Sequence, residues 1–360
     1  MDAKRPLVSV VTPFYNTADY LSECIESVLR QTYDNWNYVL VNNRSTDKSA
    51  EIAEHYVKLY PERFRLEHNA DFLSQVQNYN RALRLISPES KYCKLVQADD
   101  WLFPECLALM VEVAERDPSI GVVGAYGLEG RDVAFDGLPY PSSRVDGKTV
   151  CRLFFLEHRY LFGSPTQLLL RSDLVLGRTA FYDESYIPFE DAAVIFQLLR
   201  QWNFGFVHQV LTFSRRDNSS VMKSLLDLDC SVAFELLMQR EFGHLFLQPH
   251  EYRYLLRRNE RVYSKLLVEG MVELRGREFW RFHGAMLKRM RYRFYSARVW
   301  GLLILGLSDV VLNPKWALST FVRSLWRKLV ELRTRWFAPS HGSAESVSLP
   351  QDAEGRKISQ

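Results

Sequence analysis

Short apolar runs alternate with segments of helical periodicity through roughly the first 215 residues. Apolar runs rich in β-branched residues indicate buried strands, and apolar positions three or four apart indicate amphipathic helices. This alternation predicts βαβ units, and therefore an α/β fold with a mainly parallel sheet and right-handed crossovers. We expect strands at residues 7–12, 38–41, 64–67, 120–125, 167–171 and 206–213, with one more from Lys94 to Asp99, and helices at 19–31, from Asp47 onward, and at 72–85, 104–116, 150–159 and 192–201.

The pattern changes twice after residue 125. Residues 127–146 are rich in Gly, Pro, Ser and charge, which predicts a long loop able to close over a ligand. From residue 225 to 336 glycines are few and helical periodicity dominates, so a second, helical region is expected. The predicted organisation is an α/β domain at 1–222, a helical, basic region at 223–338 and a disordered tail at 339–360.

Polar residues follow three of the predicted strands. In open α/β sheets, ligands bind at the carboxyl edge, where parallel strands end together. Two adjacent carboxylates at that edge favour a divalent metal such as Mg²⁺ or Mn²⁺, because neighbouring anions otherwise repel and hard cations prefer oxygen ligands. The alternative is a pair of solvated turn or helix-capping residues. The residues delivered to the edge are Tyr15 and Asn16, then Asn42, Asn43, Ser45 and Asp47, and finally Asp99 and Asp100.

Two common nucleotide signatures are absent from the sequence. No G-x-G-x-x-G follows the first strand and no G-x-x-x-x-G-K-[ST] occurs, which argues against a dehydrogenase and a P-loop ATPase. A second acidic pair, Glu190 and Asp191, opens the predicted helix at 192–201. Taken alone, acids in a first helical turn are more often caps than catalysts.

Charge and cysteine content bear on the expected partner surface and cellular location. The chain carries a net charge of +3, but residues 275–336 carry +11 and the remainder −8, so the C-terminal region is expected to face an anionic surface. Five scattered cysteines without metal-site spacing indicate reduced thiols, and no secretory signal is recognised, so a cytoplasmic location is expected. The most apolar stretch, 299–312, is too short to span a bilayer.

The basic helices permit two interpretations. Met286, Met290 and Phe294 share a helical face opposite Lys288 and Arg291, and a similar pattern recurs at 322–336. Such helices either lie in the interface of an anionic membrane or pack on the α/β domain with a solvated basic face. Nucleic acid is not an expected partner, because no recognised binding module accompanies the charge.

The ordered set of motifs over about 215 residues resembles the family 2 glycosyltransferases, inverting enzymes with a GT-A nucleotide-sugar-binding domain. Each piece is weak alone, but their order and spacing are specific. The motifs are Val8 to Asn16, Leu21 to Tyr33, Val41 to Ser49, Asn78 to Ala82, Gln97 to Pro104, Phe181 to Glu184 and Glu190-Asp191.

The resemblance implies roles for individual residues. Asp99 matches a residue for the sugar or ribose, Asp100 matches the metal ligand, and Asp191 matches the catalytic base. Two departures concern the donor site: Asn42-Asn43 replace the usual Asp-Asp, and Gln97 replaces a frequent Asp. The positions implied for nucleotide-sugar binding are Pro13, Tyr15, Asn16, Asn42, Asn43, Ser45 and Asp99.

The expected function is therefore transfer of a sugar from a nucleoside-diphosphate sugar, with UDP as the expected nucleotide, to a hydroxyl of a glycan or lipid-linked acceptor. Arg215 or Arg216 is a candidate for holding the diphosphate, while His68, His158 and His208 are expected to be structural. Two alternatives stay open. One is a degenerate, non-catalytic GT-A scaffold, and the other is a sugar-phosphate nucleotidyltransferase.

Overall fold

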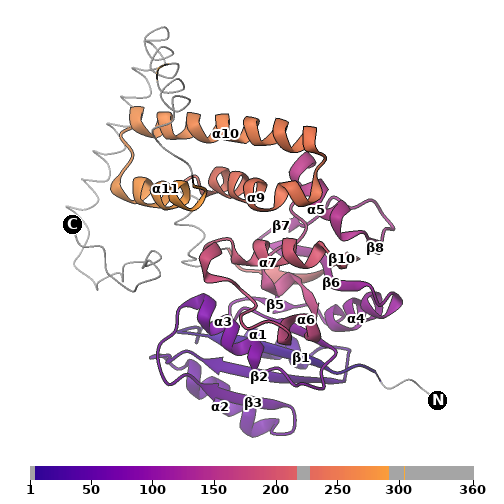
Figure 1. Ribbon diagram of the computed structural model, residues 1–360. Coiled ribbons are helices and arrows are strands. Elements are labelled where there is room, and N and C mark those ends of the chain that lie inside the picture. Colours follow the sequence, from indigo (N-terminus) through magenta and orange to yellow (C-terminus); the bar gives the residue numbers. More distant parts are fainter. Residues whose placement is uncertain (1–4, 217–227, 292–303, 305–360) are drawn as a thin grey trace. The chain divides into compact units, whose positions relative to one another are not determined.

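The computed structural model describes residues 5–216, 228–291 and residue 304 (Figure 1). The chain divides into two compact units, residues 1–219 and 220–360. Apart from residue 304, the predicted faces and tail beyond residue 291, including 299–312 and 322–336, lie outside the described residues.

One sheet forms the framework of the first unit. The strand order is β3-β2-β1-β4-β9-β6-β10-β5, with β7 beside β6 and β8 beside β10. β1, β2, β3 and β4 run parallel, and β6 and β10 keep their direction, while β9 is antiparallel to both of its neighbours. The strands are β1 Val8–Phe14, β2 Trp36–Asn42, β3 Phe64–His68, β4 Tyr92–Leu95, β5 Trp101–Leu102, β6 Ile120–Glu129, β7 Asp132–Ala134, β8 Arg144–Val145, β9 Leu169–Arg171 and β10 Asn203–Ser214.

Helices cover both faces of the sheet because each buries an apolar stripe. The main core joins α1, α2 and α4 to the face of β1 that carries Val8 and Val10. α3 packs against β1 and β2, and α7 packs against β6 and α5. The helices are α1 Leu21–Leu29, α2 Ser49–Leu59, α3 Gln75–Arg84, α4 Cys106–Arg116, α5 Gly147–Glu157, α6 Ser172–Leu176 and α7 Glu190–Leu199, with 3₁₀ turns η1 Pro165–Gln167 and η2 Glu184–Tyr186. The predicted α/β architecture is confirmed.

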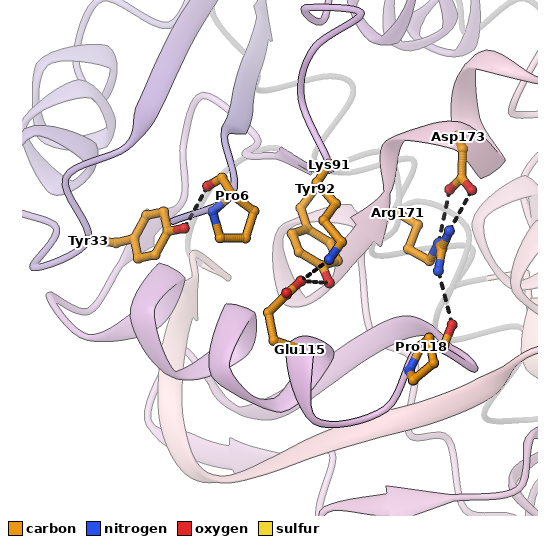
Figure 2. Close-up of polar contacts among 8 residues, drawn as sticks. All are labelled: Pro6, Tyr33, Lys91, Tyr92, Glu115, Pro118, Arg171 and Asp173. Carbon is orange, nitrogen blue, oxygen red and sulfur yellow. Dashed lines mark hydrogen bonds and ion pairs between the residues drawn. The ribbon is translucent and has the colours of Figure 1, made fainter. Parts of the chain in front are cut away.

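The amino edge of this sheet is closed by side chains (Figure 2). Glu115 at the end of α4 accepts from Tyr92 at 2.5 Å and pairs with Lys91 at 2.6 Å. Arg171 pairs with Asp173 and donates to the carbonyl of Pro118 at 3.0 Å. The polar loop residues 15–16, 42–47 and 97–100 lie at the opposite, carboxyl edge, where β1, β2 and β4 end.

Several predicted elements differ in detail. The predicted loop at 127–146 contains the end of β6, the hairpin strand β7 and strand β8, because Gly130 adopts a positive φ of 63° that reverses the chain. The strand predicted to reach Asp99 ends at Leu95, and both aspartates lie in the turn that follows. Strand β5 and turn η1 were not predicted.

The second unit is helical over its described residues. It contains α9 Cys230–Phe246, α10 Pro249–Val272 and α11 Arg277–Arg289. α10 packs along α9, where Arg240 pairs with Glu260 at 3.3 Å. Tyr263 of α10 hydrogen bonds the buried His283 of α11 at 2.9 Å. In the described parts of the chain, no helix is both long enough and apolar enough to cross a membrane.

Candidate active site

Two loops at the carboxyl edge are tied together by Asn16. Its side-chain oxygen accepts from the backbone N–H of Thr46 at 2.8 Å, and its own backbone N–H donates to Ser45 Oγ at 3.1 Å. Asn16 adopts a φ of 50°, a conformation that asparagine tolerates better than most residues. Tyr15 and Asn16 are exposed beside this contact, whereas Pro13 is buried within β1. Of these three residues, only Tyr15 and Asn16 present side chains to solvent.

Asn42 and Asn43 are buried and engaged within the chain. Asn42 donates to His68 Nδ1 at 3.1 Å and accepts from the backbone N–H of Ser45 at 2.9 Å. Asn43 accepts from Asn69 and exchanges two hydrogen bonds with the backbone of Leu73. The amide pair therefore shapes the β2–α2 and β3–α3 loops. A role for either side chain in binding the nucleotide sugar stays a prediction.

Asp99 and Asp100 are adjacent but have different surroundings. Asp100 is 4% exposed, and its carboxylate accepts from Thr166 Oγ1 at 2.6 Å, Ser214 Oγ at 3.2 Å and the backbone N–H of Arg215 at 3.1 Å. Burial, reinforced by the charge of Asp99, raises the pKa of Asp100 to about 7. Asp99 is partly exposed. The two carboxylates therefore lie in different surroundings, one buried and one partly exposed.

Three residues around Asp100 were missed by sequence reasoning. Thr166 and Gln167 belong to η1, and Ser214 ends β10. Gln167 donates to Ser214 at 2.7 Å, and Ser214 in turn donates to Asp100. No local motif marks these residues, because the partner of Thr166 lies 66 positions away in the sequence.

A pair of tyrosines connects the Asp99-Asp100 turn with α7. Tyr79 of α3 accepts from Gln97 at 3.0 Å, and its ring lies 6.1 Å from that of Tyr182. Burial raises the pKa of both phenols, with a smaller contribution from Asp99 and Asp100 at Tyr79 and from Asp191 at Tyr182. Asn80 holds the backbone of Tyr182 with two hydrogen bonds, at 2.7 and 2.8 Å. The Asp99-Asp100 turn thus acts on Tyr79, Asp191 acts on Tyr182, and the two tyrosine rings lie beside each other.

Glu190 and Asp191 occupy the first turn of α7. Burial raises the pKa of Asp191 to about 6, and burial together with the charge of Asp191 raises the pKa of Glu190 to about 7. Glu190 Oε2 is buried without a hydrogen-bond partner among the described residues. A simple capping role would leave these pKa values low, because a helix N-terminus favours the ionised form. The arrangement suits a carboxylate that takes up a proton near neutral pH.

The basic and histidine candidates are held by other residues of the chain. Arg215 pairs with Glu23 at 2.5 Å and lies over the ring of Tyr20, and Arg216 pairs with Glu129. A diphosphate contact by either arginine stays a prediction. His208 hydrogen bonds Tyr126 at 2.8 Å and approaches the carbonyl of Ser142 at 3.0 Å, in keeping with a structural role.

The carboxylate oxygens at the carboxyl edge of the sheet are suitable ligands for a hard divalent cation. Among residues 5–216 and 228–291, no three His, Cys, Asp or Glu side chains gather as metal ligands. The Asp99-Asp100 turn contains two carboxylates at the carboxyl edge. Mg²⁺ is typically held in this way, with substrate phosphates and water completing its coordination.

Comparison with known proteins identifies the first unit. The profile of glycosyl transferase family 2 matches residues 9–175. The chain carries a family 2 glycosyltransferase domain. Glycosyltransferase GlyG of Streptococcus pneumoniae is 33% identical over 130 residues, which cover 36% of this chain and 42% of GlyG. An uncharacterised glycosyltransferase of Rickettsia typhi, RT0329, is 27% identical over 225 residues, or 62% of this chain and 68% of the relative.

Solved structures support the GT-A fold. S. aureus TarS 1–349, solved with UDP-GlcNAc, superposes with a TM-score of 0.56 at 15% identity and 88% coverage of both chains. The mannosyltransferase PcManGT from Pyrobaculum calidifontis, solved with GDP-Man and Mn²⁺, gives a TM-score of 0.51 at 16% identity and covers 91% of this chain and 89% of PcManGT. The chain spans less than half the length of GlyG and a third of B. subtilis EpsJ.

Proposed function

We propose that this protein is an inverting glycosyltransferase that moves a sugar from a nucleoside-diphosphate sugar, with UDP as the expected nucleotide, to a hydroxyl of a glycan or lipid-linked acceptor. The observation that carries the proposal is that one unit contains two acidic features. One is the partly exposed turn Asp99-Asp100, and the other is Asp191, whose pKa is raised to about 6. The UDP-GlcNAc and GDP-Man complexes of TarS and PcManGT support a nucleotide-sugar donor.

Asp191 has the role of general base. Its ionised carboxylate removes the proton from the acceptor hydroxyl, whose oxygen then attacks the anomeric carbon from the face opposite the nucleoside diphosphate. The bond to the diphosphate breaks as the new glycosidic bond forms, so a single displacement inverts the configuration. A base with a pKa near 6 is largely ionised at neutral pH and still basic enough to accept the proton.

Asp99 and Asp100 form the proposed cation site. A bound Mg²⁺ or Mn²⁺ supplies Lewis acidity that offsets the charge of the leaving diphosphate. The resemblance assigned the cation to Asp100 and the sugar or ribose to Asp99. The surroundings of the two residues favour Asp99 over Asp100 as the cation ligand. The Asp100 carboxylate already accepts three hydrogen bonds from the chain, and Asp99 is the more exposed. We therefore propose Asp99 as the carboxylate that reaches the cation and Asp100 as the anchor of the turn.

The helical unit is proposed to dock on an anionic membrane surface at the cytoplasmic face. Arg253, Arg257 and Arg261 recur every four residues along α10 and are exposed, with Tyr254 and Val262 also exposed beside them at 69% and 47%. This combination of cations and apolar side chains complements anionic headgroups. A lipid-linked acceptor would be reached from such a position.

The test is binding and turnover of a panel of nucleotide sugars by the purified full chain, with Mn²⁺ or Mg²⁺ and with EDTA. We expect metal-dependent binding of one donor and its slow hydrolysis. Asp191→Asn is expected to bind the donor with wild-type affinity and to lose turnover. If the wild-type chain binds no nucleotide sugar in either condition, the non-catalytic scaffold becomes the better account. Release of pyrophosphate from a nucleoside triphosphate and a sugar phosphate would instead identify a nucleotidyltransferase.

A further inference from the structure

Lys94 is a buried cation in the middle of the sheet. It lies on β4 with 0% exposure, five residues before Asp99. Within the described residues its ammonium donates to the carbonyls of Thr166 at 2.7 Å and Leu168 at 3.2 Å, and approaches Met110 Sδ at 3.6 Å. Burial lowers the pKa of the Lys94 amine. A buried amine is costly unless its N–H groups find acceptors, and here the carbonyls of Thr166 and Leu168 supply them.

The carbonyls that Lys94 binds belong to the turn that holds Asp100. Thr166 is the central residue of η1, and its hydroxyl donates to Asp100 at 2.6 Å while accepting from the backbone N–H of Gln97 at 3.1 Å. Lys94 therefore fixes the backbone of η1, and the Thr166 side chain fixes both ends of the turn from Gln97 to Asp100. The backbone also contributes, because the N–H of Asp100 donates to the carbonyl of Gln97 at 3.0 Å and the N–H of Val96 donates to the carbonyl of Val11 at 2.9 Å. These bonds do not reach η1, so the connection between η1 and the turn comes from Thr166.

We propose that Lys94 is a positioning residue for the cation and diphosphate site, acting through Thr166 on the Asp99-Asp100 turn. This inference rests on the proposed function. Hydrogen bonds from an ionised donor are shorter and stronger than neutral ones, so an ammonium holds η1 more firmly than a neutral side chain would. A methionine at 94 would fill a similar volume and leave the Thr166 and Leu168 carbonyls without their donor.

A purely structural role for Lys94 makes a different prediction. Replacing a buried charge by an apolar side chain of similar volume is often neutral or stabilising. If Lys94 only supports the fold, Lys94→Met changes stability and leaves ligand binding unaltered. If Lys94 positions the site, the variant loses affinity for the nucleotide in the presence of Mn²⁺ more than in its absence, because only the metal-dependent part needs the carboxylate turn.

The experiment is calorimetric titration of the full chain with UDP, the nucleotide of the proposed donor, with Mn²⁺ and with EDTA. We expect Lys94→Met to weaken Mn²⁺-dependent binding about tenfold and binding in EDTA less than about twofold. Thr166→Val is expected to have a similar effect. The double variant should be no worse than either single variant, because both changes break the same connection. Lys94→Gln, which keeps a hydrogen-bond donor, should restore part of the affinity, and it carries the test if Lys94→Met does not fold.

Ser172→Ala is the matched control. It removes a buried hydrogen bond to Ser90, 3.0 Å long, that does not involve η1. We expect it to lower stability without changing Mn²⁺-dependent affinity. Wild-type affinity in Lys94→Met and Lys94→Gln, or strictly additive effects of Lys94→Met and Thr166→Val, would overturn this inference alone. Absence of nucleotide binding by the wild-type chain would instead overturn the proposed function on which it rests.

Discussion

Two adjacent carboxylates, Asp99 and Asp100, are separated by their surroundings. Asp100 accepts hydrogen bonds from two hydroxyls and a backbone N–H, and is buried, while Asp99 is partly exposed. Sequence showed the pair and the strand before it, but the partners Thr166 and Ser214 lie 66 and 114 positions away. Spacing alone therefore located the acidic turn without dividing the roles of its members.

The different surroundings of Asp99 and Asp100 predict that one substitution lowers mainly stability and the other mainly turnover. Asp100→Asn brings an amide N–H against donors that now face carboxylate oxygens, and we expect a loss of about 1–3 kcal/mol in the free energy of unfolding at pH 8. Asp99→Asn should lower stability less than Asp100→Asn, because Asp99 is partly exposed, and lower turnover at least 100-fold (about 2.7 kcal/mol). Urea unfolding and donor turnover measure the two. Equal stability losses would contradict the assignment of Asp100 as the anchor.

The pKa of Asp191 predicts an acid limb in the rate profile. Burial raises this pKa to about 6, so the carboxylate is protonated and inactive as a base below that pH. We expect kcat/KM, which reports the pKa of the free enzyme, to fall about tenfold per pH unit below 6 and to level off above about pH 7. Glu190→Gln is the control and should keep an acid limb. Asp191→Asn should lose turnover by at least about 100-fold at every pH. An acid limb of unchanged shape in residual Asp191→Asn activity would show that another group is the base.

At the scale of elements, local pattern predicted the strands and helices that bury one regular face. It failed where an element depends on a distant partner. Strand β5 consists of two residues that pair with Thr212 and Phe213 of β10. The turn η1 follows Gly163, whose φ of 66° brings it so close to Gln167 that a Cβ at this glycine would lie 2.8 Å from the Gln167 side chain. Tertiary contacts of this kind leave no periodic signal in the sequence.

The exposed side of α10 yields a prediction about membranes. The triple variant Arg253→Gln, Arg257→Gln, Arg261→Gln removes three cations while Glu260 keeps its ion pair with Arg240 of α9. Each cation near an anionic surface contributes roughly 1 kcal/mol, so we expect binding to vesicles rich in phosphatidylserine to weaken at least tenfold. The measurement is flotation of the full chain with anionic and with zwitterionic vesicles.

A charge-matched variant controls for the change in net charge. Lys58→Gln, Arg131→Gln, Arg200→Gln removes three exposed cations from the first unit and should leave vesicle binding within about twofold. Equal losses in the two triple variants would mean that overall charge, rather than the α10 side chains, governs binding. If the full chain bound RNA and did not bind anionic vesicles, this result would contradict the membrane proposal.

At the scale of the whole molecule, charge and chemistry are divided along the chain. Residues 275–336 carry +11 while the remainder carries −8, and the residues proposed for donor binding and catalysis all precede residue 219. Composition and motifs in the sequence predict this division. They do not predict the acceptor, because acceptor choice depends on the shape of a surface rather than on a spacing of residues.

This division predicts where donor binding protects the backbone from hydrogen exchange. Ligand binding stabilises the segments that it contacts, and their amides then open less often. With the donor nucleotide and Mn²⁺, we expect slower exchange at residues 14–18, 42–46 and 97–101, the three loops at the carboxyl edge of the sheet, and no change in α10. EDTA should reduce the protection at 97–101 most, because Asp99 and Asp100 lie there. Asp99→Asn should reproduce the EDTA pattern in the presence of Mn²⁺. Protection at 97–101 that is indifferent to both metal and Asp99 would leave the donor site in place and remove the cation from it.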